Sequence, residues 1–259
     1  PIYIVIAYSI DDLTNATSVS FSYTLTVDYK GYEDEYSNLL QTDGSMWYIN
    51  YGTYNGNPIK WQYVGTMNAD GTNMKKYTYS STKPTGLAGK AVFVQSSLSE
   101  DSGVDSGGNL NYYNCTIRST IKDGSYFNLS AEEQALKLAQ TRIIENVESV
   151  DSNNNFENTY TLENDATDKT GDKFWLMSLQ EARTFEISSF ENSKDWWIRT
   201  SARGSSSYPN EFIYFSNSSN SFVATGGVIK LNSLINNAAS LGYTCNIRAA
   251  FILSADVSM

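Results

Sequence analysis

Histidine is absent from this sequence of 259 residues, and cysteine occurs only twice. Without histidine, the commonest general base and the commonest ligand of transition metals are missing from any catalytic or metal-binding scheme. Cys115 and Cys245 lie far apart and neither has a close-spaced partner, which excludes a zinc site and a CxxC redox motif. The pair forms either one long-range disulfide or two buried thiols; thiols are favoured because disulfide-dependent domains usually contain more cysteines.

Long apolar runs are also absent. The sequence contains no stretch of about 18 apolar residues, so it predicts no transmembrane helix. The apolar run at residues 2–10 is short and no basic residues precede it. It alternates as a strand does, which distinguishes it from the core of a signal peptide.

Basic residues are few. The chain has 18 Lys and Arg against 28 Asp and Glu, which gives a formal net charge of −10. The basic residues are scattered, so no positive patch that would bind a phosphate backbone is expected, and nucleic acid is excluded as a partner. An acidic surface also repels anionic lipid, so no membrane partner is expected.

Aromatic and small polar residues are abundant. The chain contains 19 Tyr, 5 Trp and 11 Phe, together with many Ser, Asn, Thr and Gly, and only 18% of it is charged. Tyrosine with small polar residues is typical of adaptable binding surfaces. Aromatic residues also favour strands, so the same composition fits a β-rich exported or viral protein without a binding face.

The N-terminal segment predicts a small sheet. Ile2, Ile4 and Ile6 alternate with other residues, and the same alternation runs through residues 19–27, as in a half-buried antiparallel hairpin or meander. An acidic, turn-like run follows at residues 31–35. We therefore expect an N-terminal β segment over residues 1–40, which is a candidate docking element, and a larger domain over residues 41–259.

Short strands and turns follow. Residues 59–64 and 91–94 predict buried strands, and Asn55-Gly56-Asn57-Pro58 predicts a turn. The stretch 96–108 is rich in Ser, Asp and Gly and is expected to be an exposed loop.

Two helices are predicted by the same signature, the capping box. Ser130 with Glu133 opens a segment with an apolar face that is expected to run to about Glu145. Ser178 with Glu181 opens a shorter helix directly after the apolar strand 174–177. The residues between these helices, 148–173, are rich in Asn, Asp and Thr and predict a long loop.

The C-terminal third predicts further strands at residues 212–215, 222–231 and 246–253. Together with the two helices they give an antiparallel α+β domain. No internal repeat is present.

Several motifs, in a fixed order, resemble one known family. Residues 112–118 (YYNCTIR), followed by Phe127 and the helix from Ser130, look like its S-x-I-R-x-W-L segment and the helix after it. Residues 174–182 (FWLMSLQEA) look like its F-L-L-S-x-x-E-A strand and helix start. Residues 196–200 (WWIRT) and 246–251 (NIRAAF) look like its W-W-L-R-S and G-V-R-P-A-[LF] signatures.

The family is an uncharacterised domain of Firmicutes surface proteins and phages, similar to the formylglycine-generating-enzyme branch of the C-type lectin fold. The resemblance covers roughly residues 47 to 254, and an ordered set of motifs is more specific than any one of them. It implies an α+β, C-type-lectin-like domain with antiparallel sheets and two helices. Asn246 and Ala249 stand where the family has Gly and Pro, and Thr200-Ser201 lacks its usual Pro.

The resemblance places the segment 202–217 where lectin-like folds put their ligand-facing loops. Its Ser, Tyr, Asn and Phe content also looks like the variable regions of diversity-generating retroelement proteins. The alternative is a solvated polar loop with no ligand. The predicted contact face consists of Tyr208, Asn210, Phe212 and Tyr214. Arg203 and Trp197 are further candidate ligand-binding residues beside it.

Two tryptophans and two arginines have competing interpretations. Trp196 and Trp197 are candidates for a sugar-stacking platform, but adjacent strand residues point to opposite sides, so at least one is expected in the core. Arg199 and Arg248 are candidates for binding a ligand carboxylate. In a domain with so few charges, we expect them instead to make buried, charge-assisted hydrogen bonds to carbonyls or to an acid such as Glu181.

Calcium binding is not predicted. Asp151, Asn153, Asn155 and Glu157 alternate oxygen ligands, but Phe156 stands where an EF-hand requires Gly. The Glu-Pro-Asn and Trp-Asn-Asp motifs of calcium-dependent lectins are absent. No metal or other cofactor is therefore expected.

These observations favour a non-catalytic recognition module on a phage particle or bacterial surface. Its expected partners are a host receptor or glycan and other subunits of a viral or surface assembly, including copies of itself. The alternative is a purely structural virion or appendage protein. An enzyme is not expected, because the formylglycine-generating relatives need a close cysteine pair, and no spacing singles out a pair of catalytic carboxylates.

Overall fold

The computed structural model describes residues 36–97, 101–102, 112–144, 147–151, 160–163, 171–187, 194–203, 211–218, 220–224 and 245–255. The chain divides into two compact units, Pro1–Gly31 and Tyr32–Met259. The predicted N-terminal strands lie outside the described residues and remain a prediction. Residues 36–40, assigned to the N-terminal segment from the sequence, pack into the second unit: Tyr36 and Leu40 are buried, and the Tyr36 hydroxyl accepts a 2.9 Å hydrogen bond from the Leu87 N–H.

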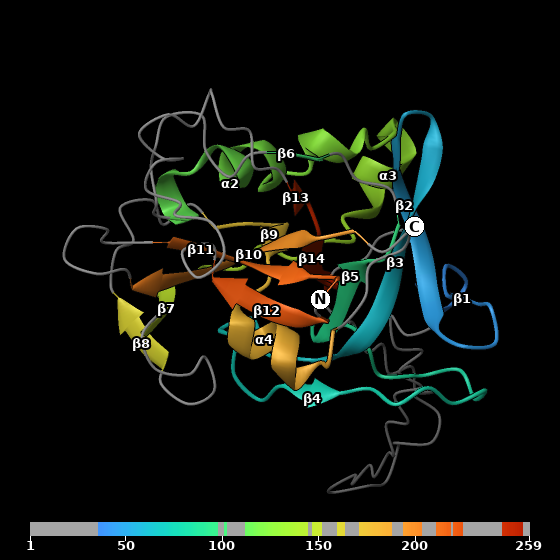
Figure 1. The fold of residues 1–259 in the computed structure, drawn as a ribbon. Coiled ribbons are helices and arrows are strands. Elements are labelled where there is room, and N and C mark those ends of the chain that lie inside the picture. Colours follow the sequence, from blue (N-terminus) through green and yellow to red (C-terminus); the bar gives the residue numbers. More distant parts are fainter. Residues whose placement is uncertain are drawn as a thin grey trace, which may run out of the picture. The chain divides into compact units, whose positions relative to one another are not determined.

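The second unit is a mixed α+β domain with two sheets, which are mostly antiparallel (Figure 1). In the first sheet the strand order is β1-β2-β3-β5-β14-β9, and β4 pairs with β3. All of its pairings are antiparallel. Its strands are β1 (Gln41–Thr42), β2 (Trp47–Tyr54), β3 (Asn57–Thr66), β4 (Lys75–Lys76), β5 (Ala91–Gln95), β9 (Trp175–Leu176) and β14 (Ala249–Ile252).

The predicted strands at 59–64 and 91–94 are confirmed as parts of β3 and β5. Of the predicted turn Asn55-Gly56-Asn57-Pro58, the first two residues form the turn, whereas Asn57 and Pro58 begin β3. The turn joins β2 to β3, with Tyr54 opposite Asn57, and both turn residues have positive φ, 50° and 79°. Asn and Gly adopt this backbone readily, and the resulting two-residue turn matches the twist of the paired strands.

In the second sheet the strand order is β12-β11-β10-β13-β6, and β7 pairs with both β10 and β8. Strand β10 runs parallel to β7 and β13 and antiparallel to β11. The strands are β6 (Asp101–Ser102), β7 (Val147–Asp151), β8 (Tyr160–Glu163), β10 (Trp196–Arg203), β11 (Glu211–Ser216), β12 (Ser221–Ala224) and β13 (Cys245–Asn246).

Both capping boxes are confirmed. Ser130 opens α3 (Ala131–Leu136) and Ser178 opens α4 (Leu179–Thr184), and in each the serine side chain and the third-residue Glu exchange hydrogen bonds with the backbone. The described part of the chain also contains α2 (Thr116–Ile121), which the sequence analysis missed, and the 3-10 turns η2 (Tyr112–Asn114) and η3 (Ser125–Phe127). Figure 1 shows α2 and α3 on one side of the strands and α4 on the other.

The predicted extension of α3 to Glu145 is wrong. The helix ends at Lys137, which has a left-handed backbone with φ 50°. The following residues run extended, with bridges from Ala139 to Leu253 and from Arg142 to Asp172. Of the apolar side chains that suggested a helical face, Ala139 is buried while Ile143 is 49% exposed. Pairing with distant strands thus overrides the helical pattern.

Two loop predictions also need correction. The predicted long loop at 148–173 contains β7 and β8, which form a hairpin. Ser96 and Ser97, at the start of the predicted exposed loop 96–108, are buried, and their hydroxyls bond to the backbone of Lys60. Segments rich in Ser, Asn and Asp can form strands or be buried when their polar groups are hydrogen-bonded, so composition alone predicted loops here wrongly.

The core of the first sheet is aromatic. The Trp61 ring lies 5.1 Å from the rings of both Phe127 and Phe251, and 5.5 Å from that of Phe174. Its indole N–H donates to the Tyr51 carbonyl at 2.7 Å, so the buried polar atom is satisfied. Aromatic side chains of this size bury the most apolar surface per residue and fix the strands that carry them.

The chain itself joins the two sheets, because β13 of the second sheet continues within three residues into β14 of the first. Where β9 and α4 meet β10, the Arg199 N–H donates to the Met177 carbonyl at 2.9 Å, and the Leu179 N–H donates to the Thr200 hydroxyl at 2.7 Å. We call this junction of β9, α4 and β10 the seam. Within the described ranges, none of the helices combines the length and apolar character that crossing a bilayer requires.

Candidate functional site

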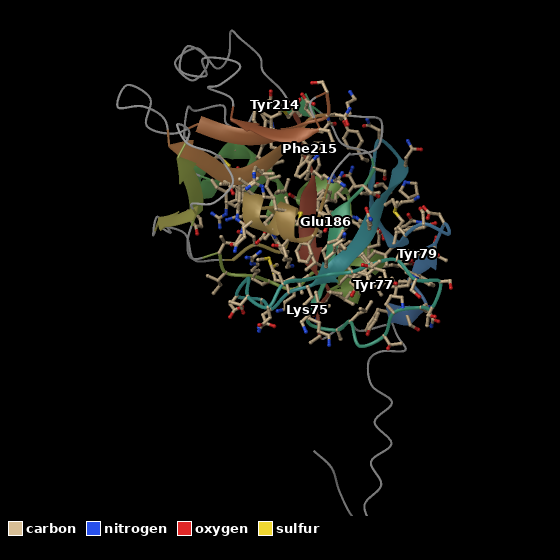
Figure 2. All side chains as sticks on the ribbon, turned by 60° about the horizontal axis from the view of Figure 1, so that its bottom comes forward. Lys75, Tyr77, Tyr79, Glu186, Tyr214 and Phe215 are labelled. Atoms are coloured by element: carbon tan, nitrogen blue, oxygen red, sulfur yellow. The ribbon has the colours of Figure 1, made fainter. Side chains whose placement is uncertain are left out.

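The β10–β11 hairpin carries the predicted contact face, and its base is packed with aromatic side chains. Trp196 pairs with Phe215 and Trp197 with Tyr214 across the two strands. The first pair stacks with centroids 5.5 Å apart and the second meets edge to face at 6.0 Å. All four side chains are buried, and Figure 2 shows Tyr214 and Phe215 on β11, away from the tyrosines near β4.

Trp197 and Tyr214, two of the predicted ligand-binding residues, are thus packed inside the domain, with exposed fractions of 2% and 4%. Both tryptophans are core residues, as the alternation along a strand favours for at least one of them. In this structure Trp197 and Tyr214 position the hairpin.

The other predicted contact residues lie farther along the hairpin. Arg203 is the last residue of β10, opposite Asp151 of β7, and Phe212 of β11 lies opposite Ser201. Tyr208 and Asn210 are outside the described residues, in the segment that connects the two strands. The register of the hairpin shifts between Trp197 and Ser201, and such an irregularity bends a strand and re-aims its side chains. The contact face stays a prediction.

The expectation that Arg199 and Arg248 are structural is confirmed. Arg199 binds Glu181 through two hydrogen bonds of 2.6 Å and also donates to the Leu176 carbonyl at 2.8 Å. Arg248 donates to the Gln95 carbonyl at 2.9 Å and lies over the Trp196 ring. Both arginines are buried, so each holds two distant segments together with charge-assisted hydrogen bonds.

The sequence analysis missed two further buried ion pairs. Arg142 donates to Glu181 at 2.7 Å, so this carboxylate is shared by two arginines. Arg118 on α2 binds Asp172 at 2.7 Å, and both are buried. One signal pointed to the second pair, because Arg118 belongs to the family-like segment 112–118, but nothing in the sequence identified Asp172.

Burial and pairing act in opposite directions on these groups. Burial alone would raise the pKa of Glu181, but the Arg142 and Arg199 guanidiniums outweigh it and hold that pKa well below its ordinary value. Burial lowers the pKa of Arg248 to about 9 and also lowers the pKa of Arg142. Glu181 is therefore ionised and locked between cations, which makes it unfit to exchange protons with a substrate at neutral pH.

Cys115 and Cys245 are buried and form no disulfide in the structure, which confirms the favoured alternative of two thiols. The Cys115 thiol donates to the Tyr112 carbonyl at 3.1 Å. Across the described ranges, no three His, Cys, Asp or Glu side chains gather as metal ligands would. Of the alternating acidic run 151–157, only Asp151 is described.

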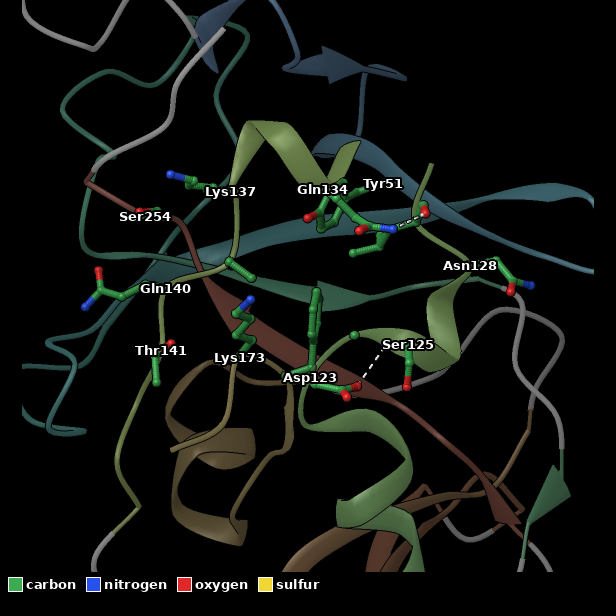
Figure 3. A pocket seen from close by; sticks show the side chains of 14 residues that line it. Tyr51, Asp123, Ser125, Asn128, Gln134, Lys137, Gln140, Thr141, Lys173 and Ser254 are labelled. Atoms are coloured by element: carbon green, nitrogen blue, oxygen red, sulfur yellow. Dashed lines mark hydrogen bonds between the residues drawn. The ribbon is translucent and has the colours of Figure 1, made fainter. Parts of the chain in front are cut away.

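A polar cleft of about 970 Å³ opens beside α3 and η3 (Figure 3). Two of its polar side chains serve the local backbone: Asp123 accepts from the Ser125 N–H at 2.9 Å, and Gln134 donates to the Leu129 carbonyl at 2.9 Å. Figure 3 shows Lys137 and Lys173 on its walls. The cleft offers hydrogen bonds and positive charge but, among its described lining residues, no pair of acid and base in contact.

Comparisons with protein-family models, with curated proteins and with solved structures found no match.

Proposed function

We propose that this chain is a non-catalytic recognition module of the C-type-lectin-like class, displayed on a phage particle or bacterial surface. It binds a host receptor, glycan or protein through the segment 203–217. The mixed α+β architecture with two mostly antiparallel sheets supports the class. The proposed recognition role and surface location are supported by the ordered family-like motifs, because fold alone does not specify function.

One observation carries the proposal: the hairpin that leads into this segment is anchored at its base by four buried aromatic residues in two cross-strand pairs. Binding loops work best when a rigid scaffold holds their ends, because less conformational freedom is then lost on binding. The segment beyond the anchor contains three consecutive serines (205–207) with Tyr208 and Asn210, residue types that adaptable paratopes use.

The chemistry of the described acids also favours binding over catalysis. Glu181 and Asp172 are buried and neutralised by arginines. A catalytic acid or base needs a pKa near the working pH, whereas the pKa of Glu181 is pushed far from it. The buried charges of this domain hold its elements together.

The test is binding of the purified chain to host cells and to a glycan panel, with Tyr208→Ala, Asn210→Ala and Phe212→Ala. Interface hot spots each contribute more than about 1 kcal/mol, so we expect the triple variant to bind at least roughly tenfold more weakly. Matched controls are Asn57→Ala on β3 and Tyr79→Ala in the segment after β4, which change the same residue types and should bind as the parent chain does.

Unchanged binding by the triple variant would sink the proposal. If the parent chain instead binds only to copies of itself or to other subunits of its assembly, the protein is structural. Tyr214 is left out of the triple variant because it is buried against Trp197, so its loss would disturb the scaffold.

A further inference from the structure

A second cavity lies over the seam and has charged walls. Its volume is about 760 Å³, and it is enclosed by the turn 69–74 between β3 and β4, the extended segment 141–144 and the start of α4. Arg142, Glu181 and Arg199 all line it. None of the described residues of the segment 203–217 lines it.

Four charged described residues line this cavity: Arg142, Arg199 and Glu181 are buried, and Asp70 is exposed. Two guanidiniums share the carboxylate of Glu181, so among these three buried side chains, each at most 6% exposed, the positive charges outnumber the negative by one. Burying an uncompensated charge is costly, and proteins usually pair such charges with a counter-ion. The Trp175 ring, 4.9 Å from the Arg142 guanidinium carbon, offsets only part of this cost.

Arg142 has hydrogen-bonding capacity that the described chain does not use. This side chain is 5% exposed, and its Nη1 atom donates to Glu181. Its Nε atom is buried and makes no hydrogen bond within the described chain. The Nε and Nη2 groups of an arginine lie along one edge of the planar guanidinium, the arrangement that binds the two oxygens of a carboxylate.

The turn 69–74 packs its backbone against the Nη2 end of this edge. Gly71 has a φ of +85°, and a Cβ atom placed on it would lie 2.5 Å from Arg142 Nη2. A side chain at position 71 would therefore collide with the guanidinium. The glycine both permits the turn and leaves the Nη2 end of Arg142 uncovered by a side chain.

The nearest acid in the turn does not neutralise Arg142. The Asp70 carboxylate accepts hydrogen bonds from the Thr72 N–H at 2.9 Å and from the Thr72 hydroxyl at 2.6 Å. These bonds, and more weakly the charge of Arg142, lower the pKa of Asp70. Asp70 forms no ion pair with Arg142 in the structure, and it is fully exposed, so solvent screens its charge.

The rim adds an apolar component. Ile143 is 49% exposed, unusually high for a large apolar side chain in this domain, and it lines the cavity together with half-buried Met74. Such a combination of one charged anchor and an apolar rim is typical of small-molecule sites.

We propose that this cavity binds a small organic carboxylate, whose two oxygens accept hydrogen bonds from Arg142 Nε and Nη2 while its carbon skeleton packs on Ile143 and Met74. The carboxylate supplies the negative charge that Glu181 alone does not. An acidic sugar and the free C-terminus of a short peptide both carry this group.

The test is isothermal calorimetry of the full chain with D-glucuronate and with N-acetyl-alanyl-alanine. D-glucose and the amidated dipeptide are the neutral counterparts. We expect saturable binding of at least one acid and binding at least roughly tenfold weaker for its neutral counterpart, because hydrogen bonds to charged groups are the stronger ones. Which of the two acids binds identifies the source of the carboxylate.

Two variants locate the site. Arg142→Gln should abolish binding, and Ile143→Asp, an exposed rim change that keeps the buried network intact, should weaken it at least roughly tenfold by repelling the anion. Lys137→Gln, in the separate polar cleft, should bind as the parent does. Failure of both acids to bind, equal binding of the neutral counterparts, or unchanged binding by Ile143→Asp would overturn the proposal.

Discussion

The core of the first sheet and the seam between the sheets are equally buried but differ in kind. The core is an aromatic cluster around Trp61 and Phe251, held by ring packing. The seam is an ionic cluster in which Glu181 joins Arg142 and Arg199. Apolar packing is non-directional and tolerates exchange of similar volumes, whereas a buried charge depends on its specific partner. Conservative substitutions should therefore destabilise the seam much more than the aromatic core.

The largest effect is expected from Glu181→Gln. This nearly isosteric change removes the charge that two buried arginines share, and removing one partner of a buried ion pair costs about 3–5 kcal/mol. Urea denaturation measures the free energy of unfolding. Glu132→Gln, an exposed acid in the first turn of α3, is the control and should change it by less than about 0.5 kcal/mol. A loss below about 1 kcal/mol for Glu181→Gln would show that the buried ion pairs of the seam contribute little to the free energy of unfolding.

The same cluster predicts the acid response. The folded pKa of Glu181 is lowered from the ordinary value of 4.5, so its ionisation stabilises the fold fully above that pH. As the pH falls below about 4.5, Glu181 becomes protonated in the unfolded state but stays ionised in the folded state, so the free energy of unfolding decreases. Denaturation midpoints between pH 6 and roughly pH 3 should fall less steeply for Glu181→Gln than for the parent chain; equal slopes would contradict the assignment.

A smaller effect is expected from Phe251→Leu in the aromatic core. Volume-conserving apolar exchanges cost less than about 1.5 kcal/mol, whereas Phe251→Ala should cost about 3–5 kcal/mol because a cavity remains. The same denaturation assay measures both. If Phe251→Leu were as damaging as Glu181→Gln, the contrast between the two regions would disappear.

The smallest expected effect is a difference in stability loss between alanine substitutions at the two N-cap serines. Ser130 is exposed and Ser178, in the seam, is buried, although each hydroxyl accepts from the Glu N–H three residues on at 3.1 and 3.0 Å. Loss of an N-cap serine costs about 0.5–2 kcal/mol. Thermal unfolding should place Ser178→Ala at the upper end and Ser130→Ala at the lower end; the reverse order would contradict a special role for the seam.

The same contrast explains which features the sequence could predict. The capping boxes and the Asn55-Gly56 turn are local, so their residues are readable in order along the chain. The length of α3 could not be predicted from the sequence, because the residues after Lys137 pair with β14 and its neighbours, which are far away in sequence. Local patterns cannot report a long-range pairing that replaces a helix.

The candidate site shows the same division. Burial of Arg199 against Glu181 was predictable from the scarcity of charge and from the family-like motifs. The sharing of Glu181 with Arg142 was not, since Arg142 lies 39 residues from it in a segment that the apolar pattern assigned to a helix. A constellation assembled by tertiary pairing becomes visible only in the folded chain.

The most direct test of the recognition proposal is a structure of the native assembly that contains this chain, examined at the surface formed by residues 203–217. The proposal predicts that this surface faces outward, with Tyr208, Asn210 and Phe212 accessible to a partner. Burial of the same surface against another subunit of the assembly would contradict it and would make the protein a structural component.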